Sequence, residues 1–205
     1  MSFPLFKERV YGYLSYLNVT ESKEINSYIA KVYAELLESN TFCYRVKEYK
    51  ELFDFMKKEP YLSFLNGAVG YYFAVSTLGI ETDDQVAELA KLDQNRMLVF
   101  DACANAFIEI KNDQLKNGLS DDISYLFCPG YQGSDVSDLE IILKELKADE
   151  LGITLDESGM MLPRKTMAGI YAKGVSPRKK CGNCLKLNDC AYRKAGKLCF
   201  DLEKK

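Results

Sequence analysis

The sequence predicts an α+β fold with helices around a mixed, mainly antiparallel sheet. Two segments, 22–39 and 94–112, place apolar side chains at helical spacing, and two others, 41–49 and 68–78, have the composition of strands. Predicted helices and strands do not alternate regularly, and no internal repeat is present. This order favours α+β over a doubly wound parallel sheet.

The N-terminal half is predicted to hold two helices and then two strands. A short helix over about 5–17 packs beside the longer one, which ends at Ser39-Asn40-Thr41. Polar and aromatic residues alternate over 41–49, as in a strand exposed on one face. Residues 68–78 are rich in Val, Tyr and Phe, which is typical of a buried strand.

The next segments predict helices with identifiable starts. Thr82 with Gln85, and Ser137 with Glu140, have the spacing of capping boxes, so a helix is expected to open at each hydroxyl. The helix over 94–112 carries small residues that predict close approach of another element: Ala102, Cys103, Ala104 and Ala106.

Three short apolar runs follow the last of these helices. They span residues 153–155, 160–162 and 167–172, and Gly159 and Pro163 separate them. We expect these runs to be antiparallel strands of the same sheet.

Composition excludes several classes of function. The 205 residues include 27 Lys and Arg, 30 Asp and Glu, and no histidine, so Ser-His-Asp catalysis, Cys-His catalysis and histidine metal sites are excluded. The first ten residues lack the apolar core of a signal peptide, and the longest weakly polar stretch, 67–80, is too short to span a bilayer. We therefore expect a cytoplasmic protein without a membrane segment, whose seven cysteines are thiols or ligands.

A sharp change in charge divides the chain. Residues 173–205 hold ten basic and three acidic side chains, a net charge of +7, which leaves −10 for residues 1–172. The Gly/Pro segment 174–177 lies at this change. We expect an α+β domain over 1–172 and a basic, cysteine-rich tail over 173–205.

The tail carries the strongest local motif of the sequence, Cys181-Gly-Asn-Cys184 followed by Cys190 and Cys199. Two thiolates three positions apart converge on one ion, and the later cysteines complete an all-cysteine, four-coordinate shell. The spacing favours an iron–sulfur cluster or zinc and leaves free thiols or a redox pair as the alternative. A zinc-bearing tail that binds nucleic acid is less favoured, because few aromatic residues are interleaved with the basic ones. Cys43 and Cys103 are expected to be small buried residues.

Two further motifs could contact a ligand. Cys128-Pro129-Gly130-Tyr131 forms a rigid turn before a helix, where backbone N–H groups can meet a carboxylate or phosphate, although most such turns are connectors. In the segment 160–171, the methionines could line an apolar cofactor surface, and Arg164 and Lys165 could meet the charged periphery of that cofactor. A core hairpin with a basic turn is the simpler interpretation of this segment.

Taken in order, several segments resemble the activation domain of vitamin B12-dependent methionine synthase, and in particular the stand-alone bacterial proteins related to it that end in a cysteine-bearing tail. The segments that carry the resemblance are Thr77–Glu81, Leu98–Ala102, Cys128–Tyr131, Gly152–Ser158, Met161–Thr166 and Cys181–Arg193. The resemblance implies a C-shaped α+β domain with a twisted antiparallel sheet. It also implies that the domain acts beside a cobalamin domain, binds S-adenosylmethionine and presents its methyl group to cob(II)alamin while a reductase supplies an electron.

The resemblance implies a set of ligand-binding residues. Cys128, Pro129, Gly130 and Tyr131 would hold S-adenosylmethionine by backbone contacts and stacking, with residues of the facing strand opposite them: Thr166, Gly169 and Tyr171. The tail cysteines would hold a cluster that passes an electron to the partner's cobalt.

The sequence departs from the family pattern at important positions. Leu126 stands where the family has an arginine that grips the ligand's carboxylate, which removes a charge-assisted contact worth about 1.5–3 kcal/mol. Asn105 stands where the fused domain carries a ligand-binding glutamate. We expect an accessory protein that reactivates a methionine synthase-like corrinoid enzyme. The alternative is a non-catalytic corrinoid-protein partner that has lost S-adenosylmethionine binding.

Overall fold

The computed structural model describes residues 1–15, 19–120, 122–175, 188, 190–194 and 196. The described residues form two compact units. The first contains residues 1–40 and 84–110 and those from 188 onward, and the second contains residues 41–83 and 111–175. Two helices, α4 (Ile80–Leu92) and α5 (Gln94–Asn117), each begin in one unit and end in the other.

The first unit is helical. It contains α1 (Phe3–Leu14), α2 (Lys23–Glu38) and the short α7 (Ala191–Lys194), with most of α4 and α5. Helix α2 begins at Ser22, whose hydroxyl accepts a hydrogen bond from the Ile25 N–H at 3.1 Å. The small residues of α5 for which close packing was expected are buried, and six apolar residues of the first two helices are buried as well: Phe6, Val10, Leu14, Ile29, Val32 and Leu36.

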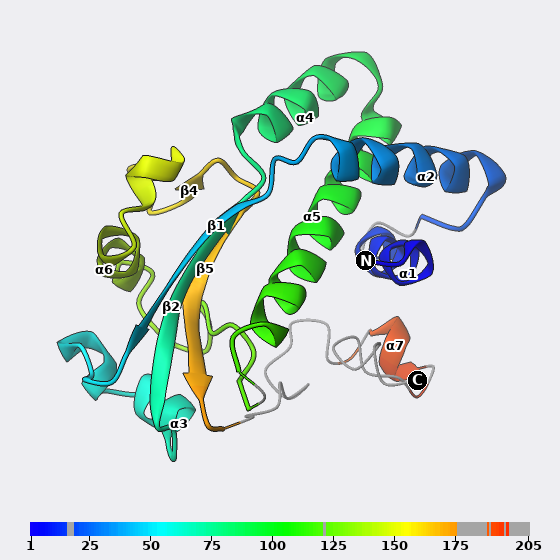
Figure 1. The fold of residues 1–205 in the computed structure, drawn as a ribbon. Coiled ribbons are helices and arrows are strands. Elements are labelled where there is room, and N and C mark those ends of the chain that lie inside the picture. Colours follow the sequence, from blue (N-terminus) through cyan, green and yellow to red (C-terminus); the bar gives the residue numbers. More distant parts are fainter. Residues whose placement is uncertain (16–18, 121, 176–187, 189, 195, 197–205) are drawn as a thin grey trace. The chain divides into compact units, whose positions relative to one another are not determined.

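The second unit is built on a three-stranded antiparallel sheet of order β1-β2-β5 (Figure 1). Its strands are β1 (Cys43–Tyr49), β2 (Gly70–Thr77) and β5 (Thr166–Lys173). The register places Phe73 opposite both Lys47 and Ile170. The predicted α+β class with a mainly antiparallel sheet is confirmed.

Short elements complete this unit. They are a 3-10 helix η2 (Asp54–Lys57), α3 (Tyr61–Leu65), α6 (Asp138–Glu145), a second 3-10 helix η3 (Ala148–Leu151), and the strands β3 (Thr154–Leu155) and β4 (Met161–Leu162). Strands β3 and β4 form a separate two-stranded sheet. The three late apolar runs do form strands, but the prediction that all of them join one sheet is wrong. Of the three, only β5 pairs with β2, and β3 and β4 pair with each other.

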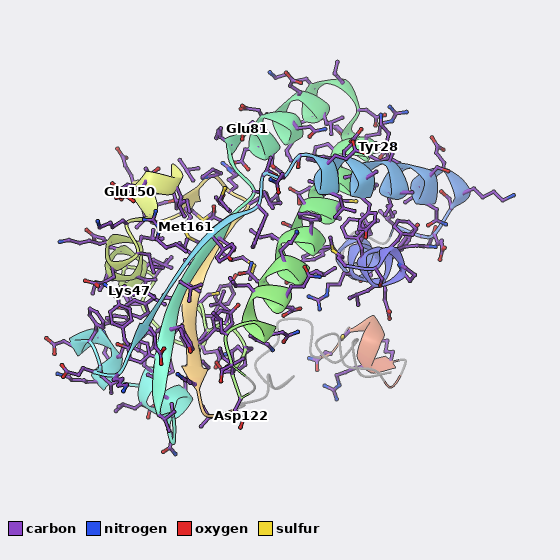
Figure 2. All side chains as sticks on the ribbon, viewed as in Figure 1. Tyr28, Lys47, Glu81, Asp122, Glu150 and Met161 are labelled. Carbon is purple, nitrogen blue, oxygen red and sulfur yellow. The ribbon has the colours of Figure 1, made fainter. Side chains whose placement is uncertain are left out.

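The two faces of the main sheet have different cores. Helix α6 packs on one face, where Phe73 and Ile170 join a large aromatic and aliphatic cluster that also contains α3 and α6 residues. Lys47, Glu150 and Met161 lie on this side of the sheet (Figure 2). The other face carries a smaller cluster of Tyr72, Ala74, Ile123 and Tyr171.

Helix α5 is longer than predicted, and its expected last residue makes a buried polar contact. Asn112, the expected last residue, is only 4% exposed, and its amide nitrogen donates to the Ser76 hydroxyl on β2 at 2.7 Å. The helix continues past this residue to Asn117, and the hydrogen bond satisfies the buried amide.

Neither predicted capping box forms its side-chain hydrogen bonds, although α6 does begin at the predicted place, with Ser137 as its N-cap residue. Helix α4 begins at Ile80, and Thr82 is buried inside its first turn, where its hydroxyl donates to the Leu78 carbonyl at 3.0 Å. Ser137 makes no side-chain cap, and its N–H instead donates to the carboxylate of Asp135 at 2.9 Å. Helix α4 therefore starts two residues before Thr82, the expected cap.

Side chains of β1 hold the end of α6. The Tyr49 hydroxyl donates to the Glu145 carboxylate at 2.7 Å, and the Lys47 ammonium group lies 3.1 Å from the same carboxylate. These bonds lower the pKa of Glu145, the tyrosine hydrogen bond most. The Arg45 guanidinium donates to the carbonyls of Leu146, the C-cap residue of α6, and Lys147, the residue after it.

Among the described helices, none is both long and apolar enough to cross a bilayer.

Candidate functional site

The turn over residues 128–134 is attached directly to β5. Phe127 and Ile170 exchange two backbone hydrogen bonds, each of 2.9 Å, immediately before the turn. A Cβ atom on the neighbouring Gly169 would lie 2.3 Å from the Phe127 carbonyl oxygen and 3.2 Å from the Cα of Cys128. Only glycine allows this approach, so the structure brings the start of the turn beside Gly169, as the sequence-based site requires.

The turn itself presents one aromatic side chain. The Tyr131 N–H donates to the Cys128 carbonyl at 3.3 Å, and Ser134 donates to the Tyr131 carbonyl through both its N–H (3.1 Å) and its hydroxyl (2.7 Å). Gly130 has a φ of +88°, which other residues rarely adopt. Pro129 is buried, whereas the Tyr131 side chain is 68% exposed. The backbone is fixed while the ring faces solvent, so the ring is available for stacking.

The other two predicted contacts on β5 lie in different surroundings. Tyr171 is 1% exposed and belongs to the cluster on the sheet face opposite α6, with its hydroxyl 3.4 Å from the Asn112 carbonyl oxygen. Burial strongly raises the pKa of Tyr171. Thr166 donates to the Thr77 hydroxyl on β2 at 2.9 Å. Their roles toward a ligand stay predictions.

Leu126 lies near the same turn and has an apolar environment. It is partly buried and packs against the cluster that contains Tyr171 and Tyr72. The two basic residues of the segment 160–171, Arg164 and Lys165, take part in hydrogen bonds through their backbone groups. The Arg164 N–H donates to the Asp83 carboxylate at 2.6 Å, and the Lys165 carbonyl accepts from Leu78 at 3.0 Å.

The predicted metal site lies mostly outside the described residues. Cys181, Cys184 and Cys199 are outside them, and Cys190 is partly exposed just before α7. Within the part of the chain that the structure describes, no group of three or more His, Cys, Asp or Glu residues could hold a metal ion.

Two other cysteines were predicted to be buried. Cys103 is buried, and burial raises the pKa of its thiol. Cys43 is exposed, so that expectation is wrong: it begins β1, which is an edge strand with exposed residues at its start.

Two contacts that support the turn were not predicted. Gln132, with a φ of +56°, donates through its side-chain amide to the Tyr125 hydroxyl at 3.1 Å. The Tyr61 hydroxyl donates to the Asp138 carboxylate at 2.7 Å, and both side chains are buried. Burial and this carboxylate raise the pKa of Tyr61. Asp138 follows the turn closely, so this pair fixes the start of α6 beside it.

Comparison with solved structures supports the fold. The chain is similar to the structure described as "Crystal Structure of the MetH Reactivation Domain bound to AdoHcy", with a TM-score of 0.56 and 12% sequence identity. The similarity covers 96% of this chain and 85% of that one. No family model matches the sequence, and no curated protein matches it. At this identity, the comparison establishes a shared fold.

Proposed function

We propose that this chain is an accessory protein that binds S-adenosylmethionine and takes part in reactivating a cobalamin-dependent methyltransferase of the methionine synthase type in the cytoplasm. The observation that carries the proposal is the shared fold over 96% of the chain with a reactivation domain whose crystal structure holds AdoHcy. AdoHcy is the thioether that remains when S-adenosylmethionine gives up its methyl group. A site for one of these molecules therefore implies a site that fits the other.

The turn that holds the Cys-Pro-Gly-Tyr motif fits such a ligand. The exposed ring of Tyr131 offers a face for stacking an adenine or attracting a sulfonium cation. Gly130 keeps the backbone open to a ligand, and Gly169 holds the turn against β5. We propose that these residues bind and orient S-adenosylmethionine, with Cys128, Pro129, Thr166 and Tyr171 supporting the site.

The role of the chain in this reaction is to position S-adenosylmethionine beside the partner's corrinoid. The methyl group leaves the sulfonium sulfur, which keeps the electron pair of the broken bond and becomes a thioether. The partner's corrinoid, reduced by one electron from a reductase or from the proposed tail cluster, supplies the electron pair of the new bond. Proton transfer is not required, so the absence of histidine is compatible with this role.

The rival proposal is a partner protein that no longer binds S-adenosylmethionine. The environment of Leu126 favours it, since this side chain packs on an apolar cluster at the position where the resemblance implies a cationic contact to the ligand. The two proposals differ in whether the isolated chain binds the small molecule.

Calorimetric titration with S-adenosylmethionine and AdoHcy separates them. We expect weak binding by the unmodified chain, loss of binding in Tyr131→Ala, and about tenfold tighter binding in Leu126→Arg, the effect of about 1.4 kcal/mol. Leu62→Arg, which adds the same charge at an exposed leucine of α3, is the control and should leave binding unchanged. Absence of binding in both the unmodified chain and Leu126→Arg would favour the rival.

A further inference from the structure

An exposed apolar surface lies where the 128–134 turn, the start of α6 and the β3–β4 turn meet. A Cβ atom on Gly130 would lie 3.5 Å from the Val136 side chain, and one on Gly159 would lie 3.7 Å from it. Val136 therefore sits between the glycine that precedes Tyr131 and the glycine that precedes Met160. These three side chains are 68% (Tyr131), 43% (Val136) and 56% (Met160) exposed, and we call them the Val136 surface.

The backbone around the Val136 surface is fixed by short hydrogen bonds. The Asp156 carboxylate accepts from the N–H groups of Ser158 (2.8 Å) and Met160 (3.0 Å). On the other side, the Asp135 carboxylate accepts from Ser137, directly after Val136. A backbone held in this way loses little conformational entropy when a partner covers the surface.

The surroundings of the Val136 surface are acidic. Residues 129–160 contain eight Asp and Glu but only two Lys and no Arg. Four exposed carboxylates lie within four residues of Val136 or Met160 in the sequence: Asp135, Glu140, Asp156 and Glu157. Hydrogen bonds lower the pKa of Asp135 and of Asp156, so both are charged at neutral pH. Lys58 and Arg164 are the cations that act on these two carboxylates, so the surface carries more negative than positive charge.

We propose that the Val136 surface docks a partner protein through a segment that presents Lys or Arg side chains around one or two apolar side chains. Apolar anchors inside a charged rim are the usual arrangement of a protein interface. The acidic rim selects a basic partner and speeds its approach, while the apolar centre supplies affinity. The Val136 surface shares Tyr131 with the proposed S-adenosylmethionine site, but the docking also needs Val136, Met160 and the carboxylates. The variants below change these residues and leave Tyr131 in place, so docking and small-molecule binding are tested separately.

The first test measures binding of a short fluorescent peptide of Lys, Leu and Phe to the full chain. Val136→Ser combined with Met160→Ser should weaken binding by about tenfold or more, because buried apolar contacts are lost. Leu92→Ser, at an 83% exposed leucine of the first unit, is the matched control and should bind as the unmodified chain does. Equal binding by the double variant and the control would overturn the proposal.

The second test uses charge and does not alter the apolar residues. Glu140→Gln with Glu157→Gln should weaken binding and reduce its dependence on salt, whereas Glu24→Gln with Glu88→Gln on the first unit should not. A control peptide with Glu in place of Lys should not bind. Amide shifts in nuclear magnetic resonance spectra should concentrate at residues 131, 136 and 160, and shifts centred elsewhere would contradict the assignment. Dimerisation of the unmodified chain that Val136→Ser abolishes would mean that a second copy, not a basic partner, occupies the surface.

Discussion

Replacing Gly169 with alanine tests whether the turn is fixed to β5 as described. The new methyl carbon would lie 2.3 Å from the Phe127 carbonyl oxygen, so the segment at Phe127 and Cys128 must move away. This movement disturbs the two hydrogen bonds between Phe127 and Ile170, worth about 0.5–1.5 kcal/mol each. Crowding a packed position adds about 1–3 kcal/mol, so we expect the free energy of unfolding to fall by about 2–6 kcal/mol.

Urea unfolding followed by circular dichroism measures this loss. Gly118→Ala is the matched control, because its Cβ would meet its nearest neighbour, the Leu115 carbonyl oxygen, at 3.4 Å, an ordinary contact. We expect the control to change stability by less than about 0.5 kcal/mol. If Gly169→Ala is as stable as Gly118→Ala, the close approach of the turn to β5 is refuted.

Three other predictions concern a buried pair, a surface carboxylate and the tail. Tyr61→Phe should lower the free energy of unfolding by about 1–3 kcal/mol, because it leaves the buried Asp138 carboxylate without the tyrosine hydroxyl. Glu145→Gln should remove part of the acid destabilisation of the chain, because hydrogen bonds lower the pKa of Glu145 below the ordinary glutamate value and so stabilise the fold at pH values above it; this stability is lost as the pH falls through the folded-state pKa. Anaerobically purified chain should contain about one metal centre, and replacing both Cys181 and Cys184 with Ser should remove it.

Each of these predictions has its own measurement and control. Urea unfolding of Tyr61→Phe is compared with that of Tyr44→Phe, at a 54% exposed tyrosine, and equal stability would show that the Asp138 contact contributes nothing. For Glu145→Gln, unfolding is measured from pH 7 to pH 3 beside Glu24→Gln, and parallel curves for both variants and the unmodified chain would contradict the linkage. Elemental analysis and the ultraviolet–visible spectrum report the metal centre, for which Cys43→Ser is the control. Unchanged metal content in the double cysteine variant would rule out the tail site.

The sequence was informative wherever one pattern dominated a segment. The apolar spacing in α2 and the Val, Tyr and Phe content of β2 predicted both elements to within about two residues, since burial of one face determines each pattern. The motif around Gly130 also predicted a turn, because the glycine and proline conformations are local properties, whereas a facing strand was implied only by the family resemblance.

Long-range contacts could not be predicted in the same way. Tyr61 and Asp138 are 77 residues apart, and neither carries a local signal that it has a buried partner. The separation of β3 and β4 from the main sheet depends on pairing, which short apolar runs leave undetermined. The capping boxes failed because Thr82 and Ser137 form alternative local hydrogen bonds, and the same sequence spacing permits both arrangements.

The most direct measurement of the proposed function is transfer of a labelled methyl group from S-adenosylmethionine to the corrinoid of a methionine synthase-type protein that lacks its own reactivation domain. The partner starts in its cob(II) state under anaerobic conditions with a chemical reductant, and the labelled corrinoid is counted with and without this chain. We predict that labelling requires the chain and falls in Tyr131→Ala, while Leu62→Arg retains it. Labelling at the same rate with the chain omitted, or none with the chain present, would contradict the proposed function.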